Sequence, residues 1–166
     1  MSSATVIRPA EPADADRVAD VHLAARQDAV VRGAMPPGVH PDEEVRDWLA
    51  SRLRVDETWV AEVDGEVAAY ARFTSTWLDD LYVRPDAQGA GLGGALLDLV
   101  KSLRPDGFGL WVFETNAPAR AFYARHGLVE VERTDGSGNE ERQPDIRMEW
   151  RCPGPGRSGT TNRGTP

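Results

Sequence analysis

A glycine-rich stretch near the middle of the chain, Gly89-Ala-Gly91-Leu-Gly93-Gly94, has the composition of a phosphate-binding loop. Glycines let a phosphate approach the backbone N–H groups closely, and a helix that begins beside them favours negative charge at its first turn. The letters fit the dinucleotide fingerprint G-x-G-x-x-G, and Glu114 follows at about the distance at which that fingerprint has an acidic residue. A Walker loop is excluded, because no Lys-Ser or Lys-Thr pair follows the glycines.

The position of this loop in the chain argues against a dinucleotide fold. Such a fold places its first glycine directly after a strand, whereas residues 84–88 separate Val83 from Gly89. It also begins with this unit and repeats it, whereas hairpin-type strands precede the loop here. A loop that only turns the chain is disfavoured too, because each glycine at a helix start costs roughly 1 kcal/mol relative to alanine. Another phosphate-bearing ligand is the favoured interpretation, with a dinucleotide as an alternative.

Hydrophobic spacing and turn residues predict the elements that position the loop. In the first half we expect a strand at 6–8, a helix opened by residues 11–14, a second helix from about Pro41, and a hairpin of strands 58–63 and 66–73. Asp64-Gly65 between these strands is typical of a type I′ turn. The two helices carry apolar stripes of Val18, Val21 and Ala25, and of Val45, Trp48, Leu49 and Leu53.

The second half supplies the loop with its strand and its helix. We expect a strand at 78–83, a helix from near Gly91, a buried strand at 108–113, a short helix capped by Asn116 and ending at Gly127, and a strand pair at 128–132 and 146–150. The helix after the loop should bury Leu92, Leu96, Leu99 and Leu103. The predicted order, β-α-α-β-β-β-α-β-α-β-β, is an α/β (α+β-like) fold: a mixed, mostly antiparallel sheet of about six to seven strands with four helices.

Two separate blocks resemble the GNAT superfamily of acetyl-CoA-dependent N-acetyltransferases. Gln88-Gly-Ala-Gly91-Leu-Gly93 is similar to its Q/R-x-x-G-x-G/A loop, and Leu81-Tyr-Val-Arg-Pro is similar to the strand ending before that loop. Residues 116–128 resemble N-x-x-A-x-x-x-Y-x-x-x-G-F, with Leu128 in place of Phe. The resemblance implies the GNAT fold over residues 1–151 and the transfer of an acetyl group from acetyl-CoA to a primary amine by direct attack.

The resemblance also implies roles for individual residues. The residues expected to hold the pyrophosphate are Gln88, Gly89, Ala90, Gly91, Leu92 and Gly93, and those offering main-chain groups to the pantetheine arm are Leu81, Tyr82 and Val83. Asn116 should contact the cofactor arm, cap its helix, or do both. Tyr123 should contact the cofactor and act as the general acid that protonates the departing thiolate. A domain that binds CoA only as a sensor or scaffold is the non-enzymatic alternative.

A general base is harder to assign. Asp79 is the candidate, because it lies two residues after Trp77, whose position carries a glutamate in some family members, and so faces the same side of a strand. Asp80 should face the other way, and either carboxylate could simply be a solvated charge. Acceptor choice is expected from residues 18–54, 59–77 and 134–145, which do not identify the amine as a small molecule or a peptide.

Length, composition and charge limit the number of domains, the partners and the compartment that the protein can have. The length of 166 residues suits one domain, followed by a disordered tail at 152–166. The net charge of −8 argues against nucleic acid as the main partner, and fits a cationic substrate or plain solubility. His22, His40 and His126 lack metal-ligand spacing, so no metal is expected. Without a signal peptide, a membrane span or a cysteine besides Cys152, we expect a cytoplasmic protein with no membrane partner. A homodimer is left open.

Overall fold

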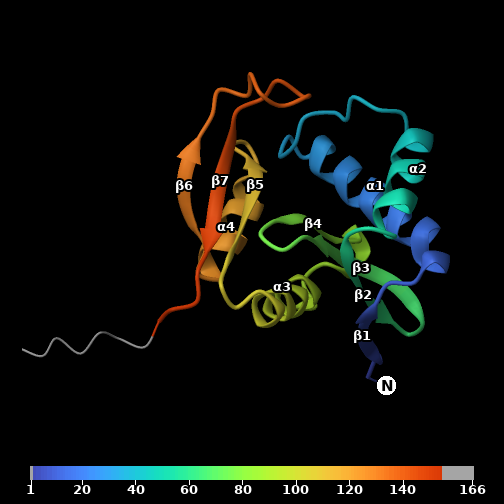
Figure 1. Cartoon of the computed structure of the whole chain (residues 1–166). Coiled ribbons are helices and arrows are strands. Elements are labelled where there is room, and N and C mark those ends of the chain that lie inside the picture. The colour runs from blue at the N-terminus through green and yellow to red at the C-terminus, as the bar shows by residue number, and fades with distance from the viewer. Residues whose placement is uncertain (1, 155–166) are drawn as a thin grey trace, which may run out of the picture.

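Residues 2–154 are described by a computed structural model, in which they form seven strands and four α-helices (Figure 1). The elements are β1 (Thr5–Pro9), α1 (Ala15–Val31), α2 (Asp42–Arg52), β2 (Glu57–Val63), β3 (Glu66–Phe73), β4 (Leu78–Val83), α3 (Leu92–Leu103), β5 (Phe108–Phe113), α4 (Ala117–Arg125), β6 (Val129–Arg133) and β7 (Asp145–Trp150). Short 3-10 turns at Pro12–Asp14 and Pro85–Ala87 precede α1 and the glycine loop. The predicted order is confirmed. Most of the predicted tail, from residue 155 on, lies outside the described residues.

The strands form two antiparallel sheets, β1-β2-β3-β4 and β5-β7-β6, which stand side by side (Figure 1). Within residues 2–154, one parallel bridge between Trp77 and Gly109 joins them. A Cβ on Gly109 would lie 2.9 Å from the Trp77 ring, so only glycine permits this approach. The Trp77 ring also stacks on Trp111, with ring centroids 6.4 Å apart. The sheets therefore meet at the start of β4 and are not hydrogen-bonded along the rest of it.

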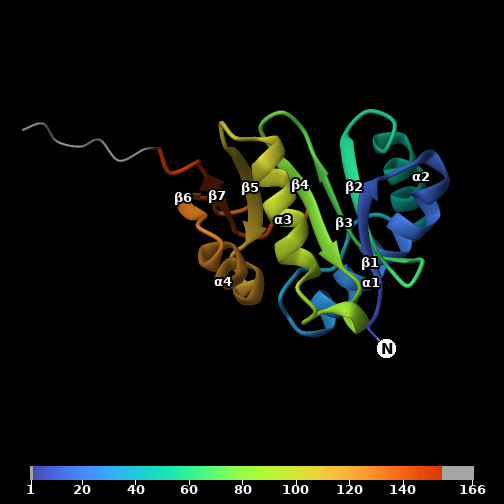
Figure 2. The ribbon, with the colours of Figure 1, turned by 90° about the horizontal axis from the view of Figure 1, so that it is seen from below.

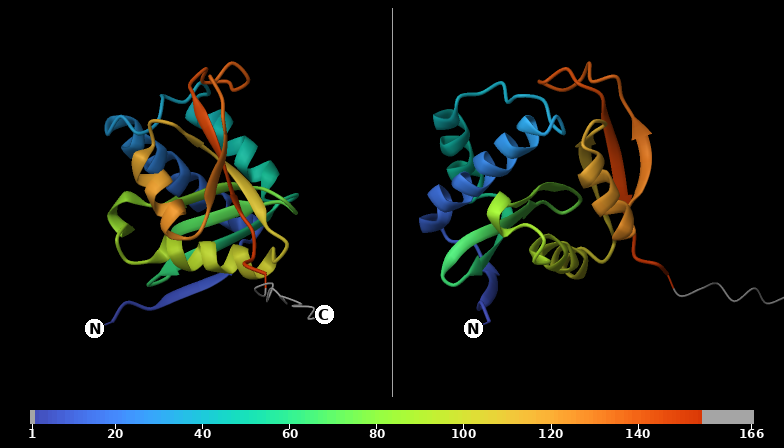
Figure 3. Two further views of the ribbon diagram at one scale, coloured as in Figure 1. Left: turned by 90° about the vertical axis from the view of Figure 1, so that its left-hand side faces the viewer. Right: turned by 180° about the vertical axis from the view of Figure 1, so that it is seen from behind.

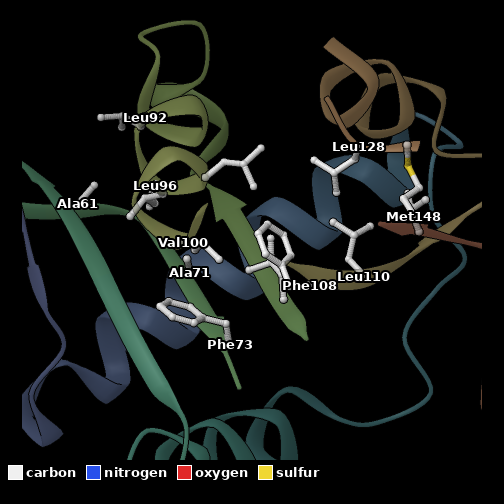
Figure 4. Close-up of a cluster of buried hydrophobic side chains, with 14 of the residues drawn as sticks. Ala61, Ala71, Phe73, Leu92, Leu96, Val100, Phe108, Leu110, Leu128 and Met148 are labelled. Atoms are coloured by element: carbon white, nitrogen blue, oxygen red, sulfur yellow. The ribbon is translucent and has the colours of Figure 1, made fainter. Parts of the chain in front are cut away.

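Helix α3 packs on one face of the first sheet, and α1 with α2 covers the other; Figure 2 shows α3 in front and α2 behind. Small side chains on the α3 face, Ala61 and Ala71 among them, let this helix approach closely (Figure 4). The buried side chains of α3 are Leu92, Leu96, Leu97 and Val100. Leu99 and Leu103 were predicted to be buried, but both side chains are only partly buried.

The opposite face buries Val18 and Val21 of α1 against Val60, Val67 and Tyr70. In α2 only Leu49 is fully buried. Trp48, which shares its predicted stripe, keeps 47% of its surface exposed and lies over the Arg72 guanidinium, 4.8 Å from the ring centroid. The predicted type I′ turn is confirmed by positive φ angles at both Asp64 and Gly65. Within residues 2–154, every helix falls short of the length or apolarity that a membrane crossing requires.

Candidate functional site: a glycine loop and two hollows

The glycine loop exposes a row of unpaired backbone donors before α3. Gly89 and Gly91 have φ angles of 85° and 83°, a region that L side chains rarely adopt. Within residues 2–154, no acceptor contacts the N–H groups of residues 89–94; the first N–H of the helix that is paired belongs to Ala95 and bonds the Gly91 carbonyl. Gln88 ties the loop to its strand, because its side-chain nitrogen donates to the Val83 carbonyl at 3.2 Å.

Next to the loop lies a cleft of about 310 Å³, called here the loop cleft. Seven of the predicted site residues line it: Leu81, Tyr82, Val83, Gln88, Gly93, Asn116 and Tyr123. Its other walls come from α1, the segment after α1, and α4. Leu92 turns its side chain into the core, so only its main chain can face a ligand. Gly89, Ala90 and Gly91 sit outside the cleft, at the exposed tip of the loop.

The edge of β4 that faces the second sheet offers main-chain groups to the loop cleft. Arg84 donates its N–H to Ala68 of β3. Because alternate residues of a strand point their main-chain groups to opposite sides, Leu81 and Val83 direct theirs away from β3, toward the gap beside β5. The separation of the two sheets therefore leaves a free strand edge where an extended, amide-rich chain could add.

Asn116 and Tyr123 reach the loop cleft from the two ends of α4. Asn116 caps the helix, since its side-chain oxygen accepts the Ala119 N–H at 3.3 Å, and it also lines the cleft. The Tyr123 hydroxyl has no hydrogen-bond partner within residues 2–154. Burial raises the pKa of Tyr123 above its usual value of 10.0, so this phenol stays protonated at neutral pH. It is a proton donor that is free to meet a ligand.

A second hollow of about 740 Å³, called here the acidic pocket, lies between α1, α2 and the connection of β6 to β7. Among the residues that line it are His22, Arg26, His40, Asp42, Glu44, Trp48, Asp80, Glu140 and Glu141. Five of these are carboxylates and one is an arginine, so the pocket favours a cation. Consecutive residues of β4 line the two hollows: Asp80 lines the acidic pocket and Leu81–Val83 line the loop cleft.

Ion pairs draw the β6–β7 connection over the acidic pocket, toward the segment between α1 and α2 (Figures 1 and 3). Glu140 accepts from His40 Nε2 at 2.9 Å, and Glu141 lies 3.4 Å from Arg26. Both carboxylates come from the 134–145 segment, where acceptor choice was expected, although the sequence does not single them out. Their partners lie 100 and 115 residues away, so no local pattern reveals them.

A β-bulge in β4 decides which aspartate faces a pocket. Arg72 pairs with Asp80 but the next residue, Phe73, pairs with Leu78, so Asp79 is the extra residue. The alternation used to place Asp79 breaks at this point. Asp79 is 36% exposed, lies 3.8 Å from Arg72 and lines neither hollow, whereas Asp80 lines the acidic pocket. Burial raises the pKa of Asp79. The geometry does not bring Asp79 to the site, and its role as the base stays a prediction.

A buried polar network supports the floor of the acidic pocket. Arg72 bonds Asp80 through Nε at 2.7 Å and Asp56 through Nη1 at 2.6 Å. Tyr70 donates its hydroxyl to Asp80 at 3.1 Å and lies 2.7 Å from His22 Nδ1. His22, Tyr70 and Arg72 were not among the site residues predicted from the sequence. Two signals could have found them: a histidine on the apolar stripe of α1, and an arginine inside a buried strand.

Arg72→Met should lower the free energy of unfolding by about 3–5 kcal/mol, because it leaves Asp80 buried without its cation, whereas Asp56 keeps its ion pair with Arg52. Urea denaturation would measure the loss. Arg46→Met is the matched control: its ion pair with Asp20 is exposed, so at most about 1 kcal/mol should be lost. A loss in the Arg72 variant no larger than in the control would contradict the idea that this arginine holds the network together.

Comparison with known proteins agrees with this arrangement. Residues 26–128 match the family model described as "Acetyltransferase (GNAT) family". The chain belongs to this family. An N-acetyltransferase of Archaeoglobus fulgidus, itself uncharacterised, is 34% identical over 108 residues, covering 56% of this chain and 72% of the relative. The family and this relative identify the chain as an acyltransferase, which confirms the resemblance seen in the sequence.

Solved GNAT structures have the same fold. A GCN5-related N-acetyltransferase from Rhodopseudomonas palustris superposes with a TM-score of 0.73 at 23% identity, over 91% of this chain and 98% of the other. YncA from Salmonella typhimurium, solved with its cofactor acetyl-CoA, has a TM-score of 0.67 at 22% identity, over 90% and 94%. The dinucleotide alternative is thereby set aside, since the loop follows an antiparallel sheet and a 3-10 turn.

Proposed function

We propose that this GNAT enzyme transfers the acetyl group of acetyl-CoA to a primary amine by direct attack, with the thioester in the loop cleft and the amine in the acidic pocket. The observation that carries the proposal is the placement of three features around β4: unpaired loop donors after the strand, the free Tyr123 hydroxyl in the cleft that the strand lines, and a carboxylate-rich pocket that Asp80 lines. Each matches one demand of the reaction, namely pyrophosphate binding, protonation of the thiolate and attraction of an ammonium.

The loop cleft fits the donor substrate in charge and shape. Unpaired N–H groups of residues 89–94, at the positive end of α3, suit a pyrophosphate. Nothing lies within 4 Å of a Cβ built on Gly89 or Gly91, so the approach to the loop is open. At this edge Gln88 occupies the Val83 carbonyl, while the Val83 N–H and the main-chain groups of Leu81 suit the amides of pantetheine, as in strand addition. Asn116 lines the same cleft.

Residues of this chain account for the protons in the transfer. The nitrogen lone pair attacks the thioester carbon, so a C–N bond forms as the C–S bond breaks and its electron pair leaves with sulfur. Tyr123 donates its hydroxyl proton to that sulfur and is reprotonated as the new amide nitrogen loses a proton. An acceptor that arrives as an ammonium must lose one further proton, which requires a base. Asp79 is the base proposed from the sequence.

An amine panel with a thiol-release readout tests the function. Diamines, amino acids and short peptides with free N-termini or lysines should be compared with matched amides that lack the amine. Because carboxylates dominate the acidic pocket, we expect kcat/KM for a diamine to exceed that for an amino acid of similar size by roughly five- to tenfold, and the gap to shrink in high salt.

Thermal-shift measurements separate the alternatives. Acetyl-CoA and CoA should stabilise the fold, whereas NAD and FAD should not. Stabilisation by CoA without acetylation of any amine would favour the sensor or scaffold role. Stabilisation by NAD alone would overturn the donor assignment.

A further inference from the structure

His22 lies on the floor of the acidic pocket, although it belongs to the apolar stripe of α1. Its side chain is only 6% exposed, and its Nδ1 is 2.7 Å from the Tyr70 hydroxyl. Its ring packs edge-on against the Tyr82 ring, with centroids 4.9 Å apart. Tyr82 in turn lines the loop cleft. A single aromatic ring therefore separates His22 from the cleft that receives the thioester.

The network beneath His22 selects one tautomer of its ring. Asp80, paired with Arg72, can only accept hydrogen bonds. The Tyr70 hydroxyl has one hydrogen, which it donates to Asp80, so toward His22 it can only accept. Nδ1 of His22 must therefore carry the hydrogen, and Nε2 of the neutral ring keeps a lone pair.

That lone pair is available to a ligand. Among residues 2–154, His22 Nε2 has no hydrogen-bond partner, and no fully enclosed side-chain nitrogen or oxygen lacks one. Nε2 is therefore not fully enclosed, and His22 lines the acidic pocket, where a ligand can meet it. Burial lowers the pKa of His22 from its usual value of 6.5, so the ring is uncharged at neutral pH. It is a neutral base that faces the place where an ammonium is attracted.

We propose that His22 is the general base of this acetyltransferase, held in its basic tautomer by Tyr70 and Asp80. The proposal rests on the proposed function and adds a named base to it. Nε2 accepts one proton from the acceptor ammonium and passes it to solvent, and the nitrogen pair thus freed attacks the thioester carbon. The second nitrogen proton balances the one that Tyr123 gives to the sulfur, so each turnover releases one proton.

The charged groups around His22 determine its titration. On its own helix, the Arg26 cation disfavours a charged ring, as does Arg72 from β3, whereas Asp80 from β4 favours it. Tyr70 and Tyr82 complete the contacts from the sheet. The other titratable groups that line the pocket are His40, Asp42, Glu44, Glu140 and Glu141. Burial outweighs the attraction of Asp80 and lowers the pKa of His22. The ascending limb of the profile of kcat/KM against pH should therefore lie below the usual histidine pKa.

The experiment compares His22→Gln with wild type, using a diamine that the panel shows to be acetylated. Glutamine can still donate to Tyr70 but cannot take up a proton. We expect kcat/KM at neutral pH to fall roughly a hundredfold, the ascending limb to disappear, and CoA affinity to stay unchanged. His126→Gln, the same replacement outside both hollows, should behave as wild type. If wild type is active and the His22 variant keeps the wild-type kcat/KM, His22 is not the general base, although the proposed function stands. If Asp79→Asn loses the ascending limb of the pH profile instead, Asp79 is the base.

A measurement independent of turnover tests the tautomer. Heteronuclear NMR of the histidine ring nitrogens in the free protein should find hydrogen on Nδ1 of His22, and the Nε2 signal should move when a diamine is added without acetyl-CoA. Tyr70→Phe should bring back the Nε2–H form, because the acceptor that selects the tautomer is gone. Hydrogen on Nε2 in wild type overturns the proposal. A wild type that acetylates no amine overturns the proposed function and the base together.

Discussion

Tyr123→Phe should lower kcat roughly ten- to a thousandfold, the range that a single general acid supplies, while acetyl-CoA affinity and stability stay near wild type. The ring keeps its packing beside Phe122 and loses only a hydroxyl that has no partner within residues 2–154. Steady-state kinetics with the best amine of the panel measures the loss. The deficit should shrink with an acyl donor whose thiol is more acidic, because a better leaving group needs less help.

The pH dependence gives this prediction a second readout. Burial raises the pKa of Tyr123 above 10.0, and a general acid works only below its pKa. The wild-type kcat should therefore show no loss from the phenol up to about pH 10. An unchanged kcat in the Phe variant would mean that water or another group protonates the thiolate, or that chemistry is not rate-limiting. A pre-steady-state measurement separates these two, and unfolding of the variant would make Tyr123 a packing residue.

Gly93→Glu should abolish acetyl-CoA binding while leaving the fold intact. Gly93 lines the loop cleft with an ordinary φ, and a Cβ there would make normal contacts with Phe122 and Val83 at 3.5 and 3.6 Å. A carboxylate in the first turn of α3 favours the helix. The same carboxylate would repel a phosphate about 4 Å away by about 4 kcal/mol at an effective dielectric constant of about 20. This repulsion weakens the Kd for acetyl-CoA close to a thousandfold.

The neighbouring glycine gives a less direct test of the loop. Gly91→Glu should also remove CoA binding, but its φ of 83° adds about 1–2 kcal/mol of strain and lowers stability as well. Gly154→Glu, which adds the same charge where no atom lies within 4 Å, is the control. Isothermal titration with CoA compares the variants. Unchanged affinity in a folded Gly93 variant would place the cosubstrate elsewhere.

The features that the sequence determined by itself depend on residues close together along the chain. Element order follows from hydrophobic periods of 3.6 and 2, and the Asp64-Gly65 turn and the Asn116 cap depend only on neighbours along the chain. The glycine loop is also a local feature. Its unpaired N–H groups result from the conformational freedom of glycine and from the start of a helix directly after the loop. These features could be predicted because the interactions that decide them span a few residues.

Tertiary structure decided the rest of the site. Only the pairing of Arg72 with Asp80 places the bulge at Asp79 and turns Asp80 toward the acidic pocket. Only strand assembly shows that β4 and β5 separate after the Trp77–Gly109 bridge, which opens the edge beside the loop cleft. The tautomer of His22 is selected by Tyr70, 48 residues away. Register and packing bring such partners together, and local preferences carry no information about groups that meet only once the two sheets and α1 have assembled.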